Sequence, residues 1–98
     1  MDRETVIATL RAHEAELRAA GIVGLALFGS AVRSEAGPDS DIDLLADFDR
    51  GRQLSLLDVI GIEDRLSDLL GRRVDLIEAG TLKPRVRRTV HHEAVRAF

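Results

Sequence analysis

Two aspartates separated by a single residue are the strongest chemical signal in this sequence. Asp41 and Asp43 begin an apolar segment that continues through Leu44 and Leu45. Because successive side chains of a β-strand alternate between its faces, both carboxylates point to one face while Ile42 points into a core. Carboxylates placed in this way lie about 7 Å apart and raise each other's pKa unless a cation lies between them. The pattern therefore predicts a site for a divalent metal.

The surrounding segment supports the metal interpretation. Residues 35–49 contain no Lys or Arg, and their acidic members are Glu35, Asp39, Asp41, Asp43, Asp47 and Asp49. Mg²⁺ prefers carboxylate oxygens and is commonly shared between protein carboxylates and the phosphates of a substrate. Taken alone, the two aspartates are also compatible with a solvated strand face at the edge of a sheet.

A Gly-Ser pair precedes this acidic segment. Residues 22–28 are apolar and predict a strand, Gly29 follows them, and residues 30–33 predict the first turn of a short helix. Glycine lets the backbone approach a phosphate closely, and the free amides of a helix start can donate to it together with the Ser30 hydroxyl. The pair predicts a cradle for a nucleoside triphosphate, although neither a Walker A loop nor a G-x-G-x-x-G motif is present. A plain turn with Ser30 as helix N-cap is the alternative.

A third carboxylate lies further along the chain. Residues 72–78 have the apolar content of a short strand, in which Val74 and Leu76 share one face and Asp75 the other. If this strand pairs beside the one that carries Asp41 and Asp43, three aspartates converge. Nucleotidyl transfer with two metals, held about 3.5–4 Å apart, needs such a cluster.

Together these residues resemble the signature of the polymerase-beta-like nucleotidyltransferases, and specifically of the minimal nucleotidyltransferase (MNT) group. The resemblance extends over nearly the whole chain, and Ser34 departs from it because many members have glycine after the arginine. It implies an α/β (α+β) fold in one domain, residues 1–98, with a small mixed sheet flanked by helices in the order α-β-α-β-α-β-α. The residues that carry the resemblance are Gly29, Ser30, Arg33, residues 40–44 and Asp75.

The resemblance also implies roles for individual residues. Asp41 and Asp43 would be ligands of Mg²⁺, with two ions expected, and Asp75 would be a further ligand that assists the incoming hydroxyl. ATP would be the nucleotide substrate, with its phosphates held by Gly29 and Ser30. Arg33 and Ser40 complete the expected nucleotide-binding set; Arg33 could equally pair with an acidic neighbour, and Ser40 is expected to support Asp41 from the turn.

Many members of this group are antitoxins paired with a helical HEPN toxin, and in characterised pairs the antitoxin adenylylates a tyrosine of the toxin. The resemblance therefore implies AMP transfer from ATP to a partner tyrosine. This chain contains no tyrosine, so such an acceptor must lie on another protein. Two alternatives stay open: a non-catalytic antitoxin or binding module, and nucleotidyl transfer to a small molecule, which the absence of a substrate domain disfavours.

Composition limits the remaining possibilities. The 98 residues, 45% of them hydrophobic, are enough for one small core. There is no cysteine for a disulfide or a thiolate metal site, no apolar run long enough to span a membrane, and no signal peptide pattern, so we expect a cytoplasmic protein. A net charge of −3 and only three aromatic residues argue against sequence-specific nucleic-acid binding.

The helices that must support the site have recognisable ends. A stripe of apolar residues predicts a helix over residues 2–20 that stops at Gly21, and Ser55 opens a second helix that Gly71 ends. Pro84 fits the start of a final, basic helix. The apolar side of that helix is predicted to comprise Val86, Val90, Ala94 and Phe98. The three histidines are assigned no chemistry.

Overall fold

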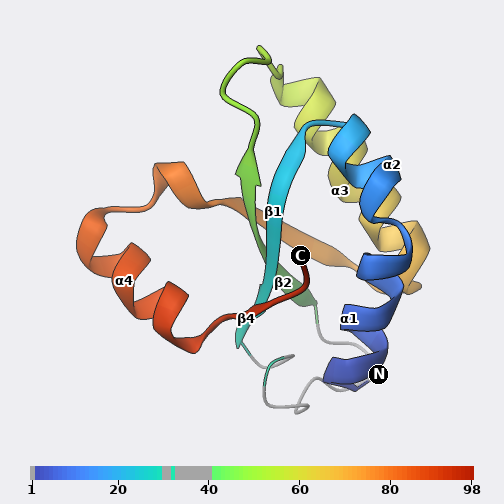
Figure 1. The fold of residues 1–98 in the computed structure, drawn as a ribbon, viewed down its shortest axis with the longest axis horizontal. Helices are drawn as coiled ribbons and strands as arrows, with labels where there is room; N and C mark the ends of the chain where they lie inside the picture. Colours follow the sequence, from blue (N-terminus) through green and yellow to red (C-terminus); the bar gives the residue numbers. More distant parts are fainter. Residues whose placement is uncertain (1, 30–31, 33–40) are drawn as a thin grey trace.

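A four-stranded mixed sheet, in the order β3-β2-β1-β4, forms the centre of the fold (Figure 1). The computed structural model describes residues 2–29, 32 and 41–98. The strands are β1 (Ile22–Phe28), β2 (Ile42–Phe48), β3 (Val74–Glu78) and β4 (Val95–Arg96). The helices are α1 (Arg3–Ala12), α2 (Glu14–Ala19), α3 (Leu56–Leu70) and α4 (Pro84–Glu93), with the short 3-10 helix η2 (Ala79–Thr81) after β3.

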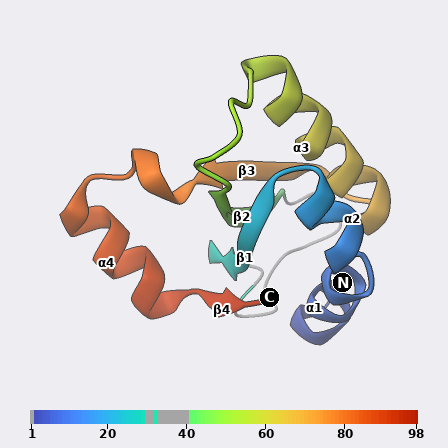
Figure 2. The same ribbon diagram turned by 45° about the horizontal axis from the view of Figure 1, so that its top comes forward.

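The strand pairing is mixed, as expected. β1 and β2 are antiparallel, whereas β2 and β3 are parallel and are connected through α3. The helices α1, α2 and α3 lie on one side of the sheet, and α4 lies on the other (Figure 2). The predicted fold class, a small mixed sheet flanked by helices, is therefore confirmed.

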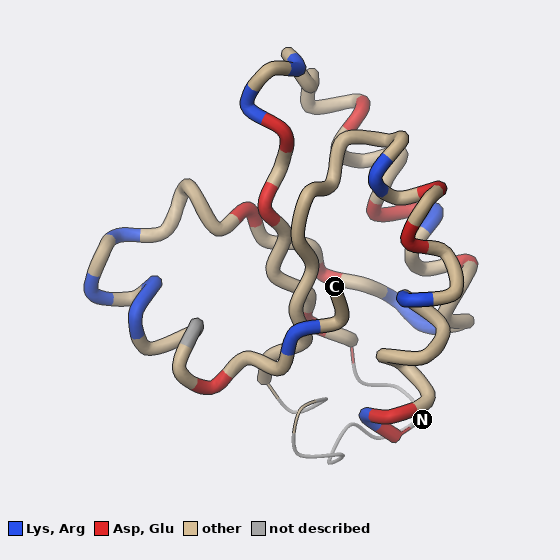
Figure 3. The backbone as a smooth tube through the Cα atoms, viewed as in Figure 1, with Lys and Arg blue, Asp and Glu red and all other residues tan. Residues whose placement is uncertain are grey.

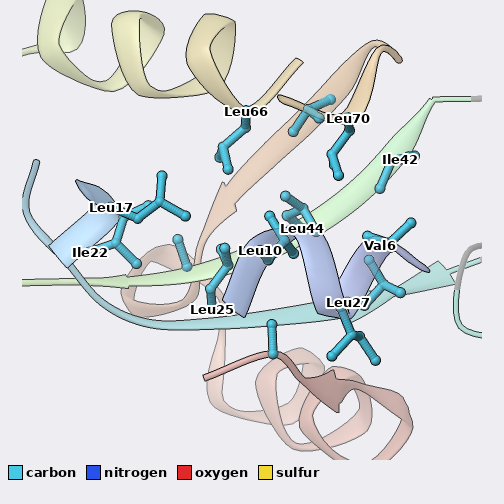
Figure 4. Packing of buried hydrophobic residues seen from close by; sticks show 14 of the residues in the cluster. Val6, Leu10, Leu17, Ile22, Leu25, Leu27, Ile42, Leu44, Leu66 and Leu70 are labelled. Carbon is cyan, nitrogen blue, oxygen red and sulfur yellow. The ribbon is translucent and has the colours of Figure 1, made fainter. Parts of the chain in front are cut away.

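The hydrophobic core lies between the sheet and the first three helices (Figure 4). A β-bulge at Val23 shifts the register between β1 and β2, so that Ile22 and Leu25 both face this core despite their odd spacing. The buried side chains that the helices contribute are Val6, Ile7, Leu10, Leu17, Ile62, Leu66 and Leu70. One face of the sheet is thereby occupied by this core, and α4 lies on the side of the other face.

The ends of α3 are where the sequence predicts them. The Ser55 side chain accepts from the Asp58 backbone N–H, and the Asp58 carboxylate accepts from the Ser55 N–H, which together form a capping box. Gly71 ends the helix in the left-handed conformation, with φ at 63°. Pro84 occupies the first turn of α4, as predicted. In the described part of the chain, no helix has both the length and the apolar character needed to cross a membrane.

Two details of the predicted element order differ at the ends of the chain. The first predicted helix is interrupted at His13, whose φ of −109° and ψ of 17° are not helical, and it forms α1 and α2 instead. The final helix stops at Glu93 rather than reaching Phe98. The predicted short helix over residues 30–33 lies, apart from Val32, outside the described residues.

The sheet edge explains the early end of α4. β4 pairs with β1 in antiparallel fashion, and the Ala97 N–H donates to the Leu25 carbonyl at 2.8 Å. The Leu25 N–H in turn donates to the Phe98 carbonyl at 3.2 Å. Backbone groups at the edge of a sheet need partners, and the last residues of the chain supply them to β1. This long-range pairing outweighs the helical pattern of the local sequence.

Candidate active site

Asp43 and Asp75 are neighbours across two parallel strands. The register places Asp43 of β2 opposite Asp75 of β3, and Asp41 directly precedes β2. Val74 is buried whereas Asp75 is exposed, so the carboxylate lies on the face of the sheet opposite the core. The conditional prediction that these two strands pair side by side is confirmed, and the pairing brings the aspartates to one face.

Like charges act on Asp43 at this position. Partial burial raises the pKa of Asp43 above its ordinary value, and the negative charges of Asp75 and Asp41 raise it further. A bound cation would remove this electrostatic cost. The described residues contain no group of three or more Asp, Glu or His side chains that by itself could hold a metal ion. That is compatible with Mg²⁺, which usually combines one or two protein carboxylates with substrate phosphates and water.

Gly29 lies against the Asp43 carboxylate. Its φ of 74° belongs to the left-handed region, and a Cβ at this position would lie 2.6 Å from Asp43 Oδ2. The Val32 N–H donates to the Gly29 carbonyl at 3.2 Å and closes a turn immediately after β1. The absence of a side chain thus lets backbone and carboxylate meet, and this close approach fits a shared site for a cation and a phosphate.

The remaining predicted phosphate contacts are Ser30, Arg33 and Ser40. They lie outside the described residues, so their assignment stays a prediction from the sequence.

The substitution Gly29→Ala is expected to weaken both the fold and the site. The left-handed backbone costs an L-residue about 1–2 kcal/mol, and the new methyl group must displace the Asp43 carboxylate. Urea unfolding should therefore show a loss of about 1–2 kcal/mol, accompanied by a large fall in nucleotidyl transfer. An unchanged transfer rate in the folded variant would show that the position of Asp43 beside Gly29 is irrelevant to the reaction.

Two polar side chains of α3 hold the strand that carries Asp75. The Val74 N–H donates to Ser67 Oγ at 3.1 Å, and the Leu76 N–H donates to Glu63 Oε2 at 2.9 Å. These contacts satisfy the edge of β3 on both sides of Asp75. Sequence reasoning missed both positioning residues, although polar residues four apart, and so on one face of the helix, were the available signal.

Basic residues gather at the start of α4. The basic residues Lys83, Arg85, Arg87 and Arg88 follow one another at the start of α4, away from the acidic residues of β2 and β3 (Figure 3). None of the side chains described in α4 is buried. The start of α4 therefore carries exposed positive charge beside the sheet.

Comparison with known proteins identifies the family. The nucleotidyltransferase domain family matches residues 10–97. Protein adenylyltransferase MntA of Thermococcus cleftensis is 44% identical over 93 residues, which cover 94% of this chain and 92% of that protein. MJ0126 of Methanocaldococcus jannaschii, provisionally named a protein adenylyltransferase, is 38% identical over 88 residues and covers 88% of each chain. The chain belongs to the nucleotidyltransferase domain family, and it is accordingly an enzyme of the nucleotidyltransferase class.

Solved structures agree with this assignment. A structure provisionally described as a minimal nucleotidyltransferase has a TM-score of 0.82 at 42% identity and covers 97% of this chain and 95% of its own. A toxin–antitoxin crystal structure with AMP-PNP has a TM-score of 0.70 at 18% identity, covering 100% and 73%. A tri-AMPylated Shewanella oneidensis HEPN toxin in complex with an MNT antitoxin gives 0.65 at 17%, covering 94% and 71%. The last two likenesses show the shared fold alone.

Proposed function

We propose that this chain is a cytoplasmic antitoxin that transfers AMP from ATP, with Mg²⁺, to a tyrosine of a HEPN-type toxin. The observation that carries the proposal is the placement of Asp43 between Asp75 and Gly29, in a chain 44% identical to a protein adenylyltransferase. The choice of partner is supported by the fold shared with the MNT antitoxin that was solved in complex with a HEPN toxin.

Some of the predicted site residues would bind the metal, and others would bind the phosphates. Asp41 and Asp43 would hold Mg²⁺, with Asp75 as a further ligand, and Gly29 with Ser30 would hold the triphosphate. When bound, the metal neutralises the phosphate oxygens and acidifies the attacking hydroxyl. Arg33 and Ser40 would complete the nucleotide site.

Transfer then requires a tyrosine oxygen in line with the α-phosphate. A bond forms between this oxygen and the α-phosphorus, the bond from that phosphorus to the bridging oxygen breaks, and pyrophosphate leaves with the electron pair. The hydroxyl proton passes to the Asp75 carboxylate. Gly29, the expected phosphate contact, lies at the end of β1, on one side of β2, and Asp75 lies on β3, on the other side. The acceptor therefore approaches from the side of β3, over Asp75.

Because this chain contains no tyrosine, a labelling experiment can tell whether the AMP acceptor lies on the partner. Incubation of the chain and its co-purified partner with ATP labelled at the α-phosphate, in Mg²⁺, is expected to label the partner and leave this chain unlabelled. Peptide mass spectrometry should locate the added AMP on a tyrosine, and a chelator should prevent the labelling. Label found only on this chain, at Ser or Thr, would contradict the transfer to a partner.

A further inference from the structure

We infer that a pocket on the face of the sheet that carries Asp43, with Leu45 in its wall, holds the nucleoside of the donor triphosphate. Asp47 and Arg96 at its far end then determine which nucleotide is accepted. The inference rests on the proposed nucleotidyl transfer and adds to it the place and the specificity of nucleoside binding.

The pocket has a volume of about 250 Å³ and lies where β1 and β2 meet the junction of α4 and β4. Gly24 contributes only backbone, Ala26 and Ala94 contribute methyl groups, and Leu45 contributes an apolar surface. Asp47 and Arg96 supply its charged groups. An apolar pocket with a few polar groups is the usual form of a small-molecule site. A more open hollow of about 640 Å³ beside α3 lies on the helical side of the sheet, away from the face that carries Asp43.

The strand register connects this pocket to the metal site. Asp43 lies opposite Phe28, Leu45 opposite Ala26, and Asp47 opposite Gly24. Alternate residues of a strand share a face and are about 7 Å apart, so Leu45 lies one such step from Asp43 and Asp47 lies two. A nucleoside attached to a phosphate at Asp43 would extend along this line.

The position of Asp75 decides between donor and acceptor. Asp75 lies on β3, on one side of Asp43, whereas the pocket lies toward β1 and β4, on the other side. In-line displacement places the acceptor oxygen and the departing pyrophosphate on opposite sides of the α-phosphorus, here toward Asp75 and toward Gly29. The pocket between β1, β2 and β4 is occupied by neither group and is thus left for the nucleoside.

Hydrogen-bonding groups of both kinds lie together at the far end. A Cβ on Gly24 would be 3.3 Å from Asp47 Oδ2 and 3.6 Å from Arg96 Nη2, so both side chains lie over this glycine. They present an acceptor and a donor side by side. The edges of nucleic-acid bases carry donors and acceptors in the same adjacent manner, and each base has its own pattern.

Filling the pocket provides the first test. Calorimetry would compare the binding of ATP and of inorganic tripolyphosphate, both with Mg²⁺, to the full chain and to Ala26→Leu. The variant is expected to bind ATP about tenfold more weakly and tripolyphosphate unchanged, because only the nucleoside is displaced. Ala94→Leu, in the pocket wall at the end of α4, should act in the same way if Ala26→Leu does not fold, and Ala15→Leu on α2 is the matched control at an exposed alanine.

Specificity provides the second test. Asp47→Asn is expected to reduce the preference among ATP, GTP, CTP and UTP about tenfold while leaving tripolyphosphate binding intact. Two results would contradict the proposed pocket without contradicting the transfer reaction. One is that ATP affinity and nucleotide preference are unchanged in these variants, and the other is that they lose ATP binding and tripolyphosphate binding equally. Failure of the unaltered chain to bind either ligand would instead overturn the proposed function together with the pocket.

Discussion

Replacement of Asp41 and Asp43 together by Asn is expected to abolish AMP transfer while leaving the fold intact. The two carboxylates would hold the metal that stabilises the charge developing on the transferred phosphate, a contribution of several kcal/mol. Their loss should reduce the initial rate with labelled ATP by about a thousandfold or more. The measurement is the rate of AMP transfer to the partner at saturating Mg²⁺.

A matched control separates the metal site from charge in general. Asp64→Asn removes one exposed carboxylate from α3, on the other side of the sheet, and should retain the rate of the unaltered chain. Asp75→Asn should lower turnover strongly, because Asp75 lies opposite Asp43. Transfer at nearly the original rate in the double variant would eliminate the metal assignment, and an unchanged rate in Asp75→Asn would remove Asp75 from the site.

Transfer chemistry also predicts how little of this chain is needed to neutralise a toxin. With ATP and Mg²⁺, about one-tenth of a molar equivalent should suppress the partner's toxic activity, because each molecule turns over many times. The Asp41 and Asp43 double variant should fail at the same dose. Titration of the toxin's activity against each protein, with and without ATP, gives the measurement.

The opposite result has a clear meaning. Neutralisation that requires equimolar protein and does not depend on ATP would identify a module that inhibits by contact alone. It would leave the family assignment intact, because that rests on the sequence match over residues 10–97.

The substitution Asp43→Asn should also stabilise the metal-free protein near neutral pH. The pKa of Asp43 is raised in the folded state by burial and by its acidic neighbours, so the folded protein binds this proton more tightly than the unfolded chain. Its stabilising contribution is complete below the ordinary pKa of 3.8 and is lost as the pH rises through the raised value. Melting temperatures in chelator should therefore be higher for the variant at pH 7, with the difference vanishing toward pH 3.8. A lower melting temperature at pH 7 would contradict this electrostatic account.

Local patterns in the sequence were sufficient for much of this architecture. Continuous apolar character determined the bounds of β1, Ser55 and Gly71 determined the ends of α3, and alternation assigned Asp75 to the face opposite Val74. In each case the physical cause lies within a few neighbouring residues.

Features that depend on distant contacts were not predictable in this way. The residues of β4 continue the apolar pattern of a helix, and only the free edge of β1 makes them a strand. The interruption at His13 has no Gly or Pro to mark it. The pocket lined by Leu45 combines β1, β2 and β4, and no motif in the chain joins Asp47 to Arg96.

The alternation along β2 has a consequence for how this protein can evolve. Ile42 and Leu44 pack in the core, whereas Asp43, the proposed metal ligand, lies on the opposite face. Residues that stabilise the fold and residues proposed for the chemistry therefore alternate along one strand. An Asp codon becomes an Asn codon through a single base change. If the proposed site is right, a lineage that loses catalysis in this way keeps a folded protein, and the inactive descendant keeps the surfaces that would contact the proposed partner. This fold makes the step from enzyme to inhibitor a short one.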